Sequence, residues 1–270
     1  MATDHRVGDR GHLARRGPRQ PTPRGGGTVK VLVVIPTYNE AENIAQIVGR
    51  ARRNDVDVLI ADDNSPDGTG AIADELAAAD PRVHVMHRAG KEGLGKAYLA
   101  AFAWGLERDY THLAEMDADG SHRPEQLGRL LSRAAEPDQP DLVIGSRYVR
   151  GGSTVNWPAS RLLLSRAGNL YIRLMLGLPV NDATAGYRVF RREILEEIGL
   201  DTVEASSYYF QTEMARRVHE LGGTIEEVPV TFVERELGDS KLSGATFKES
   251  FGRTTKLGLE RWRKKLGLGR

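Results

Sequence analysis

The chain has 270 residues, enough for one large domain or two small ones around a buried core. It has no cysteine, which excludes a disulfide scaffold and a thiolate metal site. The longest uncharged apolar stretch near its middle, 97–106, is about half of the ~20 residues that a membrane-spanning helix requires. No apolar segment follows the N-terminal arginines, so we expect neither a membrane span nor a secretory signal.

The net charge of +1 conceals an uneven distribution. Residues 1–28 carry six arginines and two aspartates, and residues 248–270 carry eight basic and two acidic residues. Basic ends on an acidic body favour an anionic surface such as a membrane or a nucleic acid, although the first segment has a solubilising tail as its alternative. We expect a disordered basic tail over 1–28, a folded domain over 29–247 and a basic amphipathic segment over 248–270.

Short apolar runs alternate with helical patterns from Val29 onward, which predicts an α/β fold with a mostly parallel sheet flanked by helices. The run Val29–Ile35 has almost no polar alternation, as expected for a strand buried on both faces. Asn39 and Glu42 have the spacing of a capping box, and the helix after them is expected to bury one apolar face. That face contains Ile44, Ile47, Val48 and Ala51.

The remaining elements follow the same alternation. Tyr98 and Trp104 lie in an apolar helical pattern and are predicted to be core residues. Pro124 suits the first turn of a helix. Strands are predicted over 56–61, 83–87, 112–116, 142–145, 187–190 and 224–233, and helices over 69–79, 96–107, 124–135, 160–178 and 208–221.

Polar residues follow four of the predicted strands. Ligands in open α/β sheets bind beyond the carboxyl ends of the strands, so these segments should carry the chemistry. Each alone reads as an ordinary polar turn, but four in register with four strands predict one site. The segments are Pro36–Glu40, Asp62–Thr69, Asp117–Asp119 and Gly145–Tyr148.

Asp117 and Asp119 are the most informative of these residues. Two carboxylates at a strand end suit a divalent cation that holds a diphosphate, because hard cations take oxygen ligands and share substrate phosphates. Asp62 and Asp63 are suited to accept hydrogen bonds from a base or a ribose. No G-x-G-x-x-G follows the first strand and no G-x-x-x-x-G-K-[ST] occurs, which argues against a nicotinamide enzyme and a P-loop protein. The pattern favours a nucleotide-sugar transferase.

The motifs resemble those of family 2 glycosyltransferases of GT-A fold. More narrowly, they resemble dolichol-phosphate mannose synthases and the bacterial polyprenol monophosphomannose synthases. The likeness runs from about residue 29 to residue 250, so that 29–247 would be the catalytic domain. The motifs that carry it are Pro36–Glu40, Asp62–Ser65, Asp117–Asp119, Gly145–Arg147, Asp182–Arg188 and Arg235–Lys241, of which the last three point to the lipid-phosphate branch.

The resemblance implies inverting transfer of mannose from GDP-mannose to a polyprenyl monophosphate, with Mg²⁺ or Mn²⁺ as cofactor. The lipid phosphate is then the nucleophile, and it needs no protein base because its second pKa is near ~6. Asp182 and Gln211 become candidate sugar contacts. The nucleoside is assigned to Pro36, Tyr38, Glu40, Asp62, Asp63 and Ala118, together with Asp119.

The same resemblance assigns the metal to Asp117 and Asp119. Ser121 stands where many members carry Gln, and its hydroxyl is an open candidate for a third ligand, directly or through water. The acceptor phosphate is assigned to Arg147, Arg161 and Ser165. Arg235 and Lys241 would close over the donor diphosphate from a mobile loop. The residues expected to act in catalysis are Asp119, Arg147, Arg235 and Lys241.

The helix over 160–178 mixes leucines with three arginines, which is typical of an interfacial helix, and a wholly internal helix is the alternative. With the similar segment 248–270, it predicts peripheral binding at the cytoplasmic face of a membrane, with or without a separate anchoring protein. Two other functions stay open. One is the same transfer from a UDP-sugar carrying glucose or N-acetylglucosamine. The other is a nonenzymatic nucleic-acid-binding module, which would leave the aligned carboxylates unexplained.

Overall fold

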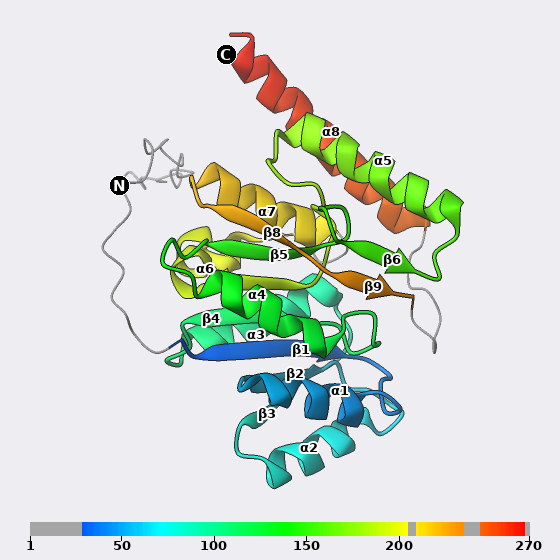
Figure 1. Cartoon of the computed structure of the whole chain (residues 1–270), viewed down its shortest axis with the longest axis vertical. Helices are drawn as coiled ribbons and strands as arrows, with labels where there is room; N and C mark the ends of the chain where they lie inside the picture. The colour runs from blue at the N-terminus through cyan, green and yellow to red at the C-terminus, as the bar shows by residue number, and fades with distance from the viewer. Residues whose placement is uncertain (1–28, 205–208, 235–243, 268–270) are drawn as a thin grey trace, which may run out of the picture.

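The computed structural model describes residues 29–204, 209–234 and 244–267. The predicted tail 1–28 lies outside this part, as do Arg235 and Lys241. A seven-stranded sheet in the order β3-β2-β1-β4-β7-β5-β8 forms the centre (Figure 1). Only β7 runs antiparallel to its neighbours, so the mostly parallel α/β sheet is confirmed. The strands are β1 (Val31–Thr37), β2 (Asp57–Asp62), β3 (Val83–His87), β4 (His112–Glu115), β5 (Leu142–Ser146), β7 (Arg188–Arg191) and β8 (Ile225–Pro229).

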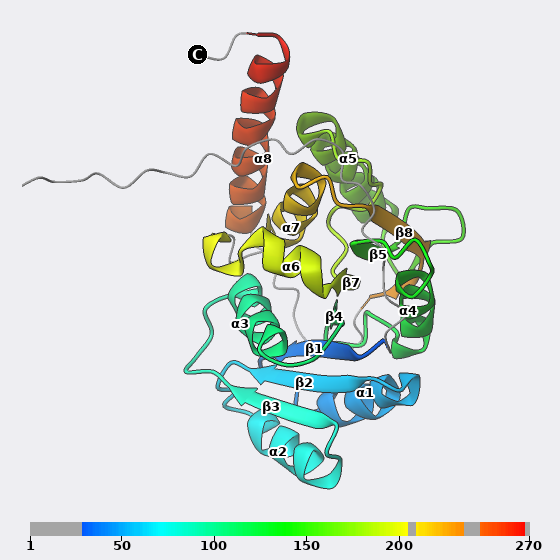
Figure 2. The ribbon, with the colours of Figure 1, turned by 90° about the vertical axis from the view of Figure 1, so that its left-hand side faces the viewer.

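Helices cover both faces of the sheet (Figures 1 and 2). Alternate residues of β1 point to opposite cores, with Val33 and Ile35 on one face and Leu32 and Val34 on the other. The first face packs on α1 (Ile44–Ala51), α2 (Thr69–Ala79) and α4 (Leu127–Ala134), which follows the short η2 (Pro124–Gln126). The second packs on α3 (Leu94–Leu106), α6 (Arg192–Ile198) and α7 (Tyr209–Glu220).

The helix after β1 confirms one prediction and corrects another. Its buried residues are Ile44, Ile47, Val48 and Ala51, as the apolar spacing indicates. The capping box is wrong, because α1 begins only at Ile44 and no side chain caps it. Asn39 instead has a φ of 59°, and its backbone N–H donates to Ser65 Oγ at 3.1 Å. Asn39 therefore joins the loop after β1 to the loop after β2 and does not cap the helix.

The predicted strand 224–233 is two strands. β8 pairs with β5 in the main sheet, whereas β9 (Thr231–Val233) pairs with β6 (Ser153–Val155) in a separate two-stranded sheet. The chain changes sheets at Val230, whose N–H donates to Ser146 O and whose carbonyl accepts from Ser153 N. This change directs β9 over the carboxyl end of β5.

The helix α5 (Ala159–Leu176) lies on the surface, so the wholly internal alternative is wrong. Only Asn169 and Leu176 of its 18 residues are buried. It packs along α8 (Gly244–Lys265), which projects beyond the sheet in Figure 2. Tyr171 stacks on Phe251 with ring centroids 4.9 Å apart. Within the part of the chain that is described, no helix has both the length and the apolar character needed to cross a membrane.

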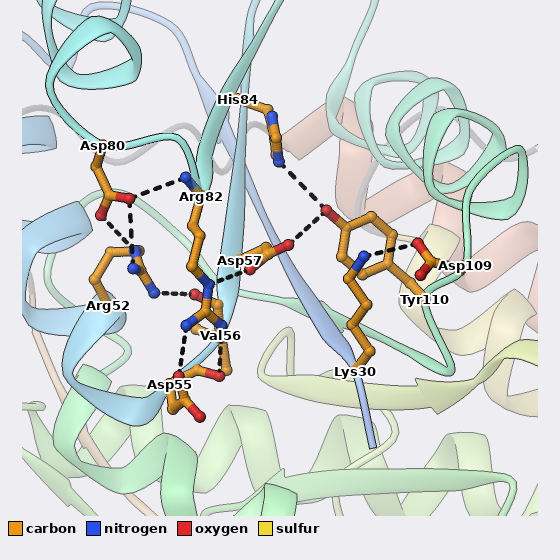
Figure 3. Close-up of polar contacts among 10 residues, drawn as sticks. All are labelled: Lys30, Arg52, Asp55, Val56, Asp57, Asp80, Arg82, His84, Asp109 and Tyr110. Atoms are coloured by element: carbon orange, nitrogen blue, oxygen red, sulfur yellow. Dashed lines mark hydrogen bonds and ion pairs between the residues drawn. The ribbon is translucent and has the colours of Figure 1, made fainter. Parts of the chain in front are cut away.

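A polar network holds the amino ends of β2, β3 and β4 together (Figure 3). Asp57 accepts hydrogen bonds from Arg82 Nε at 2.6 Å and from the Tyr110 hydroxyl at 2.9 Å. Arg52 binds Asp80 at 2.7 Å nearby. Because Asp57 is buried, its carboxylate depends on these donors for the hydrogen bonds that water would otherwise supply.

Asp57→Ala is expected to lower the free energy of unfolding by about 2 kcal/mol, because it removes the acceptor of Arg82 Nε and leaves the buried Tyr110 hydroxyl only its longer contact with His84 Nε2 at 3.3 Å. Urea denaturation followed by circular dichroism measures this loss. Asp109→Ala is the matched control. It breaks the exposed Lys30–Asp109 pair, whose side chains are 42% and 80% accessible, and should cost less than about 1 kcal/mol. Equal losses would contradict the structural role of Asp57.

Candidate functional site

The site lies where the strand order reverses, between β1 and β4. From β1 the chain proceeds to β2 on one side, and β4 returns to the other side of β1. Such a switch point leaves a crevice at the carboxyl ends of the strands. β1, β2, β4 and β5 all point the same way, so the four polar segments predicted to converge do meet at one edge of the sheet.

Asp62 ties the loops after β1 and β2 together. It is almost fully buried, and it accepts hydrogen bonds from Thr37 Oγ1 at 2.9 Å and from Ser65 N and Oγ at 3.0 and 2.6 Å. A further hydrogen bond between these two loops runs from Glu40 N to Thr69 Oγ1 at 2.9 Å. Asp62 therefore shapes the floor of the predicted nucleoside site, and Pro36, Tyr38 and Glu40 lie half-buried along it.

Two basic residues to which sequence reasoning assigned no role border this floor. Arg88 forms an ion pair with Asp63 and also binds Glu92 at 3.0 Å. Burial raises the pKa of Asp63, and the Arg88 guanidinium opposes that rise. The Lys91 ammonium lies 4.2 Å from the centre of the Tyr38 ring. The glycine-rich loop after β3 thus brings positive charge to the predicted nucleotide side.

Asp117 and Asp119 follow β4 at the switch point, each partly exposed. Asp117 Oδ1 accepts a hydrogen bond from the Tyr98 hydroxyl at 3.3 Å, and Asp119 Oδ1 accepts one from Ser121 N at 3.0 Å. Asp117 N donates to His122 Nδ1 at 3.0 Å, so that ring nitrogen carries no proton. Tyr98 is a core residue, as predicted, and also orients the first carboxylate.

These residues fit a hard divalent cation that takes part of its ligands from a substrate. No group of three His, Cys, Asp or Glu side chains suited to a metal occurs among the described residues. Mg²⁺ is commonly held by one or two carboxylates plus substrate phosphates. Ser121 Oγ is buried and has no hydrogen-bond partner in the described part of the chain, which suits a third ligand, directly or through water.

A buried polar layer supports the two carboxylates. Arg188 donates to the carbonyls of Ala185, Gln211 and Ala183 at 2.7, 2.6 and 2.8 Å, which fastens the segment before β7 to the start of α7. Glu115 is fully buried beside it, and burial raises its pKa to about 8 although Arg188 opposes that rise. Glu115 and Arg188 are partners in the β4–β7 ladder, two residues before Asp117.

Arg147 is buried, with 8% of its side chain exposed. Its Nε and Nη2 bind Asp182 at 2.7 and 2.6 Å, and Nη2 also binds Thr184 at 2.9 Å. The ion pair between Arg147 and Asp182 is therefore buried and does not lie on the surface. Asp182, a candidate sugar contact by resemblance, has no exposed surface and serves to hold Arg147.

The other predicted acceptor residues lie around Arg147. Ser165 accepts a hydrogen bond from the Tyr148 hydroxyl at 2.6 Å, and Arg161 pairs with Glu234. The Trp157 ring lies 4.3 Å from the Arg161 guanidinium and 5.3 Å from that of Arg147. Arg147, Arg161 and Ser165 thus share one aromatic-walled cluster at the start of α5.

A chain of ring contacts joins this cluster to the carboxylate pair. Phe232, on β9, lies 5.5 Å from the Arg147 guanidinium and 5.4 Å from the Trp157 ring. The Phe232 ring also lies 5.8 Å from the His122 ring. Because His122 binds the backbone of Asp117, a continuous series of contacts links the cationic cluster to the acidic corner. His122 and Phe232 have no motif spacing that would reveal this role from sequence.

The family model for "Glycosyl transferase family 2" matches residues 32–199. The chain belongs to this family. It is 54% identical over 235 residues to the polyprenol monophosphomannose synthase of Mycolicibacterium smegmatis, covering 86% of this chain and 88% of that protein. It is 55% identical over 246 residues to the undecaprenyl-phosphate mannosyltransferase of Micrococcus luteus, covering 89% of this chain and all of that protein.

Two solved structures share the fold of this family 2 member. The mannosyltransferase of Pyrobaculum calidifontis, in complex with GDP-Man and Mn²⁺, superposes with a TM-score of 0.55 at 19% identity, over 87% of this chain and 64% of that one. Glucosyl-3-phosphoglycerate synthase from Mycobacterium tuberculosis, in complex with UDP, gives a TM-score of 0.61 at 18% identity, over 85% and 80%. The GT-A-type architecture predicted from the motifs is thereby confirmed.

Tyr98→Phe is expected to weaken Mn²⁺ binding about tenfold, because the hydroxyl that orients Asp117 is lost while the buried ring remains. Titration of Mn²⁺ in the presence of GDP, followed by the electron paramagnetic resonance of the free ion, measures the affinity. Tyr110→Phe is the matched control, since it removes a buried phenol's bond to Asp57 at the opposite edge of the sheet. The control should lose stability and keep its Mn²⁺ affinity. An unchanged affinity in Tyr98→Phe would show that the phenol is only a core residue.

Proposed function

We propose that this family 2 glycosyltransferase transfers mannose, with inversion, from GDP-mannose to a polyprenyl monophosphate. The observation that carries the proposal is the continuity between Asp117–Asp119 and the Arg147 cluster through His122 and Phe232. One part suits a metal-bound diphosphate and the other an anionic acceptor. The relatives named for mannosyl transfer to polyprenyl carriers support mannose and this acceptor over a UDP-sugar.

On the donor side, Asp117 and Asp119 would hold Mg²⁺ or Mn²⁺, with Ser121 as a direct or water-mediated ligand. The ion's contribution is to neutralise charge on the departing GDP. Pro36, Tyr38, Glu40, Asp63 and Ala118 would line the nucleoside site, with Asp62 shaping its floor. Arg235 and Lys241 would contact the donor diphosphate.

On the acceptor side, Arg147, Arg161 and Ser165 would bind the lipid phosphate. One of its oxygens attacks the anomeric carbon of mannose as the bond from that carbon to the GDP oxygen breaks. The phosphate is already largely ionised at neutral pH, so no side chain has to remove a proton. The protein's work is to align two anionic partners and offset their repulsion.

A lipid acceptor requires the enzyme to work at a membrane surface. We place α5 and α8 against the cytoplasmic face of the bilayer, as peripheral elements. This placement is supported by large apolar side chains that both helices expose to solvent. They are Leu163, Leu164, Leu170 and Leu174 on α5, and Phe251, Leu259 and Trp262 on α8.

Asp119→Asn is expected to lower GDP-mannose turnover about a thousandfold, because an amide neither neutralises nor grips the cation as a carboxylate does. The assay measures radiolabelled mannose passed to a polyprenyl phosphate, with and without a chelator, and chelation should abolish transfer by the parent protein. Asp109→Asn, at the far edge of the sheet, is the control. Transfer from UDP-glucose or UDP-N-acetylglucosamine at the rate seen with GDP-mannose would overturn the proposed donor.

Arg147→Lys is expected to slow turnover at least tenfold although the charge is kept, since an ammonium cannot reproduce the fork that binds Asp182 and Thr184 together. The KM for the polyprenyl phosphate should rise, while the KM for GDP-mannose should change little. Steady-state kinetics with each substrate varied in turn separates the two. Full activity of the lysine variant would contradict the assignment of Arg147 to the acceptor site.

A further inference from the structure

A cleft beneath α5 borders the proposed acceptor site without belonging to it. Its volume is about 210 Å³. Two of its lining residues contact the acceptor cluster: the Tyr148 hydroxyl donates to Ser165 Oγ at 2.6 Å, and Asn169 Nδ2 donates to Ser165 O at 3.0 Å. Two arginines of α5, Arg166 and Arg173, line it about two helical turns apart. The lining residues are Tyr148, Arg166, Asn169, Leu170, Arg173 and Asn181.

The walls of the cleft hold both guanidinium groups. Arg173 Nη1 donates to Asn181 Oδ1 at 3.1 Å, and the Arg166 guanidinium lies 5.6 Å from the centre of the Tyr148 ring. Asn181 is itself fixed, because its backbone N–H and its side-chain amide both donate to Glu227 Oε2 at 2.8 Å. Groups that are already held lose less side-chain entropy when they bind a ligand.

The charge around the cleft is positive. α5 contains Arg161, Arg166 and Arg173 and no acidic residue in its 18 positions. Glu227 accepts three hydrogen bonds from Asn181 and Asp182, which hold its carboxylate in place behind Asn181. Guanidinium groups bind phosphate oxygens through two parallel hydrogen bonds. The cleft is therefore suited to a phosphate group.

The surface around the cleft is apolar. Leu170, which lines it, is 56% exposed, and Leu163, Leu164 and Leu174 on the same helix are 71%, 60% and 60% exposed. Exposed leucines alternating with arginines on one helix are typical of a helix lying in the head-group region of a bilayer. A soluble phosphate compound would gain nothing from these leucines, whereas a lipid would meet them with its acyl chains.

We propose that this cleft binds the phosphate group of an anionic bilayer lipid that is not the acceptor, while the leucines of α5 enter the acyl boundary. The inference rests on the membrane part of the proposed function and not on the transfer reaction. A lipid held beside Tyr148 fixes the tilt of α5, and Tyr148 in turn holds Ser165 of the proposed acceptor site. The bound lipid would thus present that site to the membrane.

The test measures sedimentation of the full chain with vesicles that contain neither acceptor lipid nor nucleotide, so failure of mannosyl transfer leaves it unaffected. Phosphatidylcholine vesicles with phosphatidylglycerol should bind the protein, and vesicles of phosphatidylcholine alone should not. The double variant R166Q/R173Q should bind the mixed vesicles about thirtyfold more weakly. R53Q/R129Q, which removes two exposed arginines from other elements, is the control and should bind like the parent.

The double variant R166K/R173K distinguishes specific binding in the cleft from attraction by positive charge alone. It keeps both charges, and we expect most of the thirtyfold loss because lysine lacks the fork. Parental binding by R166K/R173K, or an equal loss in R53Q/R129Q, would overturn the cleft. Tight binding of free glycerol phosphate by calorimetry would also overturn it, because the ligand would then be a soluble anion. Matching thermal unfolding of all variants shows that the comparison concerns binding.

Discussion

The parallel pairing of β1 with β4 is the constraint on which the site depends. Val34 and Glu115 are partners in this ladder, and Met116 N donates to Val34 O at 3.1 Å beyond it. The loop after β1 and the Asp117 turn must therefore leave the sheet side by side. No loop of the site needs to be long, because the ladder itself brings the proposed nucleotide and metal residues together.

The carboxylates at the two ends of these strands have different hydrogen-bond donors. At the amino ends, Asp57 and Asp80 accept hydrogen bonds from arginines, which cancel their charge and stabilise the fold. At the carboxyl ends, Asp117 and Asp119 accept hydrogen bonds from a phenol and a backbone N–H. A neutral donor orients a carboxylate without adding a charge of its own, which is compatible with the proposed role of Asp117 and Asp119 as cation ligands. The arginine pairs at the amino ends stabilise the fold.

The sequence predicted those parts of the molecule that are coded locally. The bounds of β3 and α2, the buried face of α1 and the alignment of four polar segments all follow from periodicity and strand order. The features that the sequence did not predict depend on contacts between residues far apart in the chain. Arg147 meets Asp182 across 35 positions, and His122 gains its role from Asp117 N and from Phe232 on another sheet. The split of 224–233 was missed because Pro229 and Val230 read as strand residues until β6 offers a second partner. A local sequence pattern does not show which of two possible strands a segment will pair with.

The sequence pattern of α5 suits either a surface helix or a core helix, and only the tertiary structure decides between them. Its leucines would suit a core, yet α8 covers only one side of it, where Gly258 comes so close to Met175 that a Cβ would lie 2.5 Å from Cε. The opposite side keeps its leucines and arginines exposed. Ser165 is on α5, and Arg147 lies in the same cluster, so the proposed function has the lipid phosphate reach the site from the α5 side. The nucleotide would enter past the β1 and β2 loops. Two substrates that repel each other in solution would then arrive from different directions and meet where cationic side chains offset their charge.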